Sequence, residues 1–264
     1  MVTKWNVAIL QMDVVHGSPA QNRHKIAQLV DSIEQSKRSI DVLLLPELWD
    51  TSYDLKRLDE IADTQEAQQF LAETAKRLNC FVIGGSVAEQ REDQVYNTTY
   101  VFDRNGHLVG DYSKVHLFRL MNEDQYLGAG EKAGLYELED QQVGSVICYD
   151  IRFPEWIRTY ALKGAKVLFV PAQWPNPRLN HWRQLLIARA IENQMYVVAC
   201  NRVGVEGKSS FFGHSLVIDP WGEVIAEGSD QEEILYAQLD LSLVDKVRGR
   251  IPVFHDRRTS LYEL

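Results

Sequence analysis

The stretch VGSVICYDIRFPE, residues 143–155, decides how the rest of the chain is interpreted. An apolar strand pattern runs into Cys148, and the following residues are typical of a turn leading into a helix that begins near Pro154. A cysteine at the carboxyl end of a strand lies where α/β sheets present groups to ligands. Free backbone N–H groups at a nearby helix start favour a thiolate and the oxyanion of an acyl-transfer intermediate. Taken alone, Cys148 also fits an ordinary core cysteine.

Two further segments end in side chains that suit catalysis. DVLLLPE (residues 41–47) is a short apolar strand pattern that ends in Glu47, and YSKVHLF (residues 112–118) places Lys114 directly after a strand-like run. Taken singly, a helix-capping glutamate and a solvated lysine are the ordinary interpretations. A cysteine, a glutamate and a lysine at three separate strand ends come together only through the fold.

These segments resemble the nitrilase superfamily of carbon–nitrogen hydrolases. The matching motifs are LLLPE around Glu47, YSKVHLF around Lys114 and ICYDIRFPE around Cys148, and the resemblance runs from residues 8–11 to residues 251–254. It implies a Glu–Lys–Cys catalytic triad. It also implies an α/β fold of the αββα sandwich type, in which two mixed sheets pack together and are flanked by helices. Largely apolar strands are in keeping with sheets that are buried on both faces.

Length and composition fit one enzyme domain. The 264 residues are 45% hydrophobic and contain no linker, so a single domain is predicted over residues 1–264. The net charge of −9 argues against nucleic acid or an anionic membrane as partner. No apolar run reaches the roughly 18 residues of a membrane span, and the amino terminus lacks a signal pattern. Three cysteines without CxxC spacing suit a cytoplasmic protein, with Cys80 and Cys200 buried.

Apolar periodicity predicts strands that alternate with helices. The first helix is predicted to begin with Ser18 as its cap, Pro19 at its first position and Gln21 closing a capping box. Asn105-Gly106 indicates the turn of a hairpin. The predicted strands span residues 5–12, 80–88, 95–102, 108–112, 165–171, 195–200, 213–219 and 233–239, and further helices span 64–78, 154–163 and 179–194.

The last segment, residues 247–264, is predicted to be a polar, irregular tail. It contains Ile251, Pro252, Val253 and Phe254, and such an apolar patch has to be buried somewhere. The resemblance implies a tail that reaches across a dimer interface, so a homodimer or larger homo-oligomer is expected.

The chemistry of amide hydrolysis gives each motif residue a role. Cys148 has to become a thiolate or lose its proton during attack. Glu47 is the candidate base and later the acid that protonates ammonia. Lys114 is expected to support the oxyanion, with the backbone N–H of Tyr149 as the second donor.

A second carboxylate lies between the lysine and the cysteine. MNEDQYLGAG (residues 121–130) resembles the family's second glutamate segment, although it lacks the usual proline before its final glycine. Glu123 matches that glutamate and is expected to orient Lys114 or the attacking water, while Asp124 is an alternative on chemistry alone. No metal or cofactor is expected, because the histidines lack ligand spacing and no phosphate-binding glycine motif is present.

Three segments resemble the ω-amidase branch of the family, whose members hydrolyse 2-oxoglutaramate. They span residues 116–123, 173–182 and 188–194, and within the second of them Trp174 follows a strand end and is expected to wall a small pocket. A small amide is therefore the expected substrate. The alternatives are an N-carbamoyl-amine hydrolase, an aliphatic nitrilase, and a non-catalytic scaffold that keeps the fold, although a scaffold has no use for the catalytic residues.

A substrate that carries a carboxylate needs a cation in its pocket. Arg152, four residues after the cysteine, is the candidate, because a guanidinium binds a carboxylate in bidentate fashion. The alternative interpretation is a structural ion pair with Glu155 or Asp150. Arg119 and Arg202 are the reserve candidates for the anchor.

Overall fold

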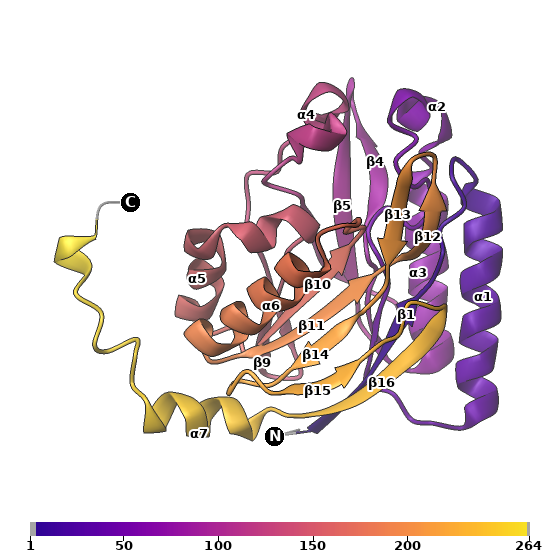
Figure 1. Cartoon of the computed structure of the whole chain (residues 1–264). Coiled ribbons are helices and arrows are strands. Elements are labelled where there is room, and N and C mark those ends of the chain that lie inside the picture. The colour runs from indigo at the N-terminus through magenta and orange to yellow at the C-terminus, as the bar shows by residue number, and fades with distance from the viewer. Residues whose placement is uncertain (1–3, 263–264) are drawn as a thin grey trace.

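Two mixed β-sheets packed face to face form the centre of the computed structural model, which describes residues 4–262 (Figure 1). Met1–Thr3 and the last two residues of the expected tail lie outside the described residues. The first sheet has the order β16-β1-β2-β3-β5-β4, with β6 and β7 also paired to β5. Its strands are β1 (Lys4–Gln11), β2 (Val42–Leu44), β3 (Phe81–Ile83), β4 (Val87–Arg91), β5 (Gln94–Phe102), β6 (Leu108–Ser113), β7 (Leu127–Gly128) and β16 (Glu233–Asp240).

The second sheet has the order β15-β14-β11-β10-β9-β8. Its central strands β9, β10 and β11 are parallel, and β8, β14 and β15 extend it in antiparallel fashion. Its strands are β8 (Gly134–Leu138), β9 (Gln141–Ser145), β10 (Val167–Ala172), β11 (Tyr196–Asn201), β14 (Leu216–Ile218) and β15 (Val224–Glu227). A separate hairpin, β12 (Val203–Glu206) and β13 (Ser209–Phe212), has no counterpart in the sequence prediction.

Helices cover the outer face of each sheet, so the predicted αββα sandwich is confirmed. The helices α1 (Pro19–Ser36) and α3 (Thr64–Leu78) lie along the first sheet, and α5 (Pro154–Leu162) and α6 (Leu179–Asn193) lie along the second (Figure 1). The shorter helices are α2 (Leu58–Ile61), α4 (Glu123–Tyr126) and α7 (Ser242–Arg250). No helix among residues 4–262 is long and apolar enough to span a bilayer.

Strand β1 shows why both faces of the first sheet are apolar. Its residues Trp5, Val7 and Ile9 belong to the core between the two sheets, whereas Ala8 and Leu10 belong to the core under α1 and α3. Successive side chains of a strand point to opposite faces, so an unbroken apolar run buries both of them. This explains why the strands appear in the sequence as continuous apolar runs and not as alternating apolar and polar residues.

The segment 80–88 is not the single strand that its composition predicts. It is divided into β3 and β4 by Gly84-Gly85, and Gly85 has a φ of +59°. A Cβ at Gly85 would collide with the carbonyl oxygen of Pro46, so the glycine allows two loops to approach closely. Ser86 N donates to the same Pro46 oxygen at 3.1 Å, which holds the loop that carries the next residue, Glu47.

The predicted hairpin is confirmed, because β5 and β6 pair in antiparallel fashion and the loop between them runs from Asp103 to His107 with Gly106 at a φ of +74°. Two other local predictions are corrected. Ser18 precedes α1, but its side chain makes no capping bond, so the predicted capping box is absent. The tail is not irregular from residue 247, because Val247 is buried within α7 and the extended segment starts only after Arg250 (Figure 1).

Candidate active site

Three strand ends of the two sheets bring Glu47, Lys114 and Cys148 together, as the sequence predicts. Glu47 follows the end of β2 by three residues, Lys114 directly follows β6, and Cys148 follows the end of β9 by three residues. The side chains of Glu47 and Lys114 are fully buried, and Cys148 is 5% exposed. Such burial excludes a solvated surface lysine.

Lys114 is held between two carboxylates. Its Nζ donates to Glu47 Oε1 and to Glu123 Oε1, each at 2.8 Å. Burial alone would lower the pKa of Lys114, but the charges of Glu123 and Glu47 outweigh burial and raise it above its ordinary value. The ammonium group therefore stays charged, although no solvent reaches it.

Glu47 is fixed on both of its oxygens. Asn97 Nδ2 donates to Oε1 at 2.9 Å, and the backbone N–H of Gln173 donates to Oε2 at 2.8 Å. The side chain of Gln173 also donates to the carbonyl oxygen of Glu47 at 2.7 Å. The sequence analysis did not identify Asn97, because an Asn within a strand carries no motif. It also did not identify Gln173 as a partner of Glu47, because the two residues are 126 positions apart in the chain.

The second carboxylate is Glu123, and the alternative Asp124 is exposed to solvent. Glu123 accepts hydrogen bonds from Tyr53 Oη and from the backbone N–H of Phe118, both at 2.8 Å. Burial raises the pKa of Glu123, an effect that the charge of Lys114 opposes and the charge of Glu47 reinforces. Glu123 can therefore position the lysine and can also hold a proton.

Cys148 occupies a strained turn. Its φ is +47°, in the left-handed region that residues other than glycine rarely adopt, and it opens the 3₁₀ turn η3 (Cys148–Arg152). Tyr149 is the second residue of that turn, so its N–H precedes the first intrahelical hydrogen bond. Such a turn presents a nucleophile beside unpaired donors.

Asp150 ties this turn to the lysine loop. Its Oδ2 accepts from the backbone N–H of Ile147 at 2.9 Å and from Tyr112 Oη at 2.7 Å. Its Oδ1 lies 2.7 Å from His116 Nδ1 and accepts from the His116 backbone N–H at 3.0 Å. Asp150 therefore has no capacity left to pair with Arg152, and His116 is a framework residue.

Burial raises the pKa of the Cys148 thiol well above its ordinary value. The charge of Glu47 raises it further, and the charge of Lys114 opposes the rise only in part. The sequence left open whether Cys148 rests as a thiolate or loses its proton during attack. The raised pKa favours loss of the proton during attack. A base close to the thiol is then required.

A small pocket of about 240 Å³ opens in front of the cysteine. Its walls include the predicted residues Tyr149, Arg152 and Trp174, and the Arg152 guanidinium lies 4.6 Å from the centre of the Trp174 ring. The complete lining is Phe118, Cys148, Tyr149, Arg152, Gln173, Trp174, Pro175 and Arg178. Arg178 lies within the segment 173–182 that resembles the ω-amidases, but the sequence analysis did not select it as a site residue.

The two reserve arginines do not line this pocket. The side chain of Arg119 is 87% exposed. Arg202 is fully buried, where it forms ion pairs with Asp13 at 2.7 Å and Glu206 at 2.9 Å. Its Nη1 also donates to Gln173 Oε1 at 2.9 Å, so it supports the pocket wall from behind.

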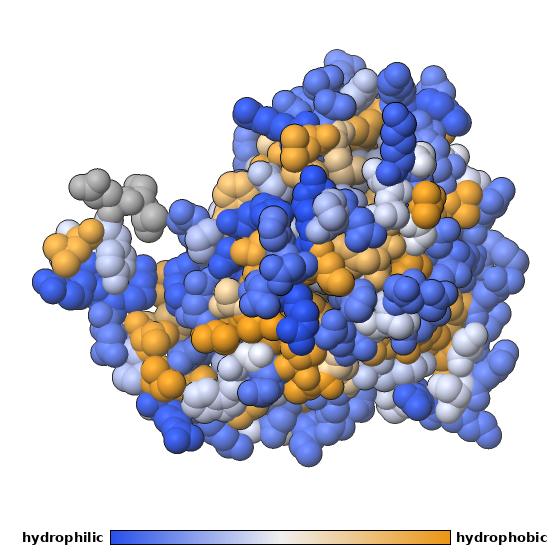
Figure 2. Space-filling model, viewed as in Figure 1, coloured by the Kyte–Doolittle hydropathy of each residue, from blue (hydrophilic) through white to orange (hydrophobic). Residues whose placement is uncertain are grey.

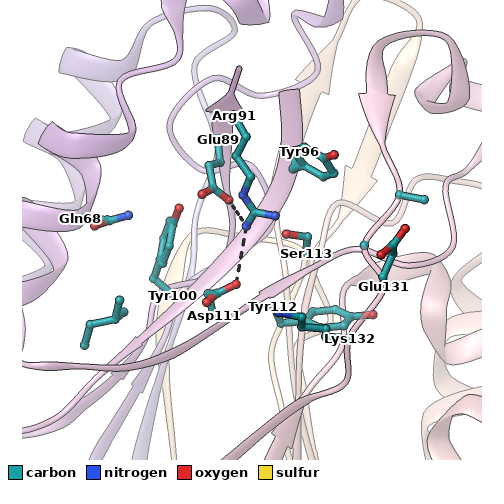
Figure 3. A pocket seen from close by; sticks show the side chains of 13 residues that line it. Gln68, Glu89, Arg91, Tyr96, Tyr100, Asp111, Tyr112, Ser113, Glu131 and Lys132 are labelled. Carbon is teal, nitrogen blue, oxygen red and sulfur yellow. Dashed lines mark ion pairs between the residues drawn. The ribbon is translucent and has the colours of Figure 1, made fainter. Parts of the chain in front are cut away.

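A larger hollow of about 1130 Å³ lies elsewhere, beside β4, β5 and β6 (Figure 3). Figure 3 shows Arg91 reaching across it to Glu89, at 2.5 Å, and toward Asp111, at 3.6 Å. None of the residues that line it is Glu47, Lys114, Glu123 or Cys148. Size alone therefore does not identify the candidate site.

Known proteins resemble this chain over nearly its whole length. A 2-oxoglutaramate amidase of Bacillus subtilis (strain 168) is 50% identical over 261 residues, which cover 98% of this chain and 100% of that protein. The omega-amidase NIT2 of Bos taurus is 34% identical, covering 98% of this chain and 97% of its own length. The crystal structure of a carbon-nitrogen hydrolase from Helicobacter pylori G27 superposes with a TM-score of 0.93 at 29% identity, covering 98% of this chain and 97% of that one. The family described as Carbon-nitrogen hydrolase matches residues 6–249, and this chain belongs to it.

Proposed function

We propose that this enzyme hydrolyses 2-oxoglutaramate, or a closely related 2-oxo acid ω-amide, to the acid and ammonia through a thioester on Cys148. The observation that carries the proposal is the buried Glu47–Lys114–Glu123 cluster beside a cysteine with a φ of +47°. The Bacillus subtilis relative, named a 2-oxoglutaramate amidase, supports the substrate.

In the first half-reaction, Glu47 takes the thiol proton as Cys148 Sγ attacks the amide carbon. The Lys114 ammonium and the Tyr149 N–H stabilise the oxyanion, and each such donor contributes about 3 kcal/mol. The intermediate then collapses to a thioester while Glu47 returns the proton to departing ammonia. In the second half-reaction Glu47 takes a proton from water as the water attacks the thioester. The carbon–sulfur bond then breaks, the acid is released, and Glu47 returns the proton to Cys148 Sγ.

Arg152 is the proposed anchor for the substrate carboxylate, and Trp174 is the ring that orients it. Arg152→Met is expected to raise KM for 2-oxoglutaramate roughly ten- to a hundredfold, the loss typical of a charge-assisted hydrogen bond. Pentanamide, which has no carboxylate, should be much less affected by the substitution. Equal losses on both amides would make Arg152 a structural residue.

Ammonia release from a substrate panel tests the function itself. The panel contains 2-oxoglutaramate, simple amides, aliphatic nitriles and N-carbamoyl amines, and the highest kcat/KM is expected for 2-oxoglutaramate. A preference for a nitrile or an N-carbamoyl amine would instead support one of the other branches. Stoichiometric alkylation of Cys148 without turnover of any compound would support a non-catalytic scaffold.

We also propose a cytoplasmic homodimer, or larger homo-oligomer, in which the tail after Arg250 contributes to the interface. Ile251 is 46% exposed, Val253 and Phe254 are half-buried, and apolar side chains gather where the tail leaves α7 (Figure 2). Cys80, Cys148 and Cys200 are all free, which suits a reducing compartment.

Truncation after Arg250 is expected to convert the oligomer to monomer or aggregate, because the apolar tail residues no longer cover a partner. Sedimentation velocity of the truncated and full-length chains measures this. A truncated chain that sediments like the full-length oligomer, or an active full-length monomer, would contradict the role given to the tail.

A further inference from the structure

Two guanidinium groups face the candidate pocket without an acidic partner. Arg152 and Arg178 both line it, and none of its lining residues is a carboxylate. Among residues 4–262, neither arginine has a carboxylate oxygen within 4.0 Å; the nearest polar contact of Arg152 is His181 Nδ1 at 3.4 Å. Arg202, by contrast, is neutralised by two acids behind the pocket.

Aromatic rings hold both guanidinium groups at the pocket. Arg152 lies over Trp174, and also over Tyr149 at 5.9 Å, while Arg178 lies over Phe118 at 5.9 Å. Both arginines are only half-exposed. The two cations are therefore directed by stacking and not by ion pairs.

Without a bound anion, the two positive charges of Arg152 and Arg178 destabilise the pocket. Burial lowers the pKa of Arg152; Tyr149 and Cys148 oppose that shift, and the like charge of Arg178 adds to it. Like charges in a partly desolvated site are stabilised by a bound opposite charge. The pair is therefore suited to an anion that offers several acceptor oxygens.

None of the residues that line the pocket offers a carboxylate that could pair with a cation. The side-chain carbonyl of Gln173 already accepts from Arg202 at 2.9 Å, and its amide nitrogen donates to Glu47. An ammonium group at the far end of a substrate would thus meet two positive charges and no carboxylate.

We propose that Arg178 is a specificity-determining residue that acts with Arg152 to select 2-oxo acid amides over amino acid amides. A 2-oxo acid presents only acceptor oxygens at carbons 1 and 2, which both guanidinium groups can bind. L-Glutamine has the same length and the same amide, but places an ammonium at carbon 2. This inference rests on the proposed function, because it concerns the far end of the same substrate.

The test measures kcat/KM for 2-oxoglutaramate, glutaramate, L-glutamine and pentanamide with the unmodified enzyme and with Arg178→Met, Arg178→Lys and Arg178→Glu. Arg178→Met is expected to lower kcat/KM for 2-oxoglutaramate roughly ten- to a hundredfold. For glutamine, kcat/KM should fall less, because the substitution removes the repulsion of its ammonium together with the attraction of its carboxylate. The preference for 2-oxoglutaramate over glutamine should therefore decrease from Arg to Lys to Met to Glu.

Two controls make the outcome decisive. Pentanamide has no carboxylate, so its kcat/KM should fall much less in the Arg178 variants than that of 2-oxoglutaramate, which shows that they are folded and catalytically competent. Arg183 lies in α6, the helix that begins directly after Arg178, and is ion-paired with Glu227 at the surface, so Arg183→Met should leave the preference unchanged. An unchanged preference in Arg178→Met, or equal losses on all four amides, would overturn the role of Arg178. Failure of the unmodified enzyme to hydrolyse 2-oxoglutaramate would overturn both the substrate proposal and this inference.

Discussion

Replacing Cys148 with alanine is expected to abolish amide hydrolysis while the chain stays folded. Only the sulfur can form the thioester, and loss of a nucleophile typically lowers kcat by a factor on the order of 10⁶. The side chain is small and 5% exposed, so its removal should leave only a minor cavity. Ammonia release and thermal unfolding, measured on the same sample, separate lost chemistry from lost structure.

Cys80→Ala and Cys200→Ala are the matched controls. Both cysteines are buried and free, but neither lines the pocket in front of Cys148. These variants should lose some stability, as core truncations do, and keep most of their kcat. Residual activity of about one per cent or more in Cys148→Ala would remove the cysteine from the role of nucleophile.

Replacing Lys114 with methionine is expected to lower kcat by at least 10²–10³-fold, the loss typical of one oxyanion donor. KM should change much less, because the ammonium acts mainly on the transition state. The substitution also leaves Glu47 and Glu123 buried without the cation that joins them, so stability should fall as well.

Glu47→Gln provides a second measurement that does not depend on the stability of Lys114→Met. The amide keeps the shape of the carboxylate, and removing one negative charge leaves the Lys114–Glu123 ion pair intact. Its kcat should also fall by orders of magnitude, because glutamine cannot accept the thiol proton. A folded variant of either residue with a raised KM and an unchanged kcat would contradict the assigned roles.

The sequence predicts the fold class and the triad because both depend on strong local signals. Apolar runs mark the strands, and Glu47, Lys114 and Cys148 each follow such a run directly or within three residues. The carboxyl ends of strands in a sandwich of this kind meet in a small region, so side chains at these ends are expected to converge.

Features that depend on contacts between distant segments could not be predicted. The division of the segment 80–88 follows from the carbonyl of Pro46 approaching Gly85, which no local pattern records. Asp150 is a second example. Its carboxylate joins the cysteine turn to the lysine loop, and no local sequence pattern indicates this role. Arg178 lies in the pocket only because the loop before α6 folds back toward Phe118.

Mass spectrometry of the enzyme, quenched in acid at intervals from milliseconds to steady state with 2-oxoglutaramate, tests the central claim most directly. The predicted result is a covalent adduct with the mass of the substrate less ammonia, on the peptide that contains Cys148 and absent from those that contain Cys80 or Cys200. An acyl group on another residue, or an unmodified Cys148 peptide at every quench time while ammonia is released, would contradict it.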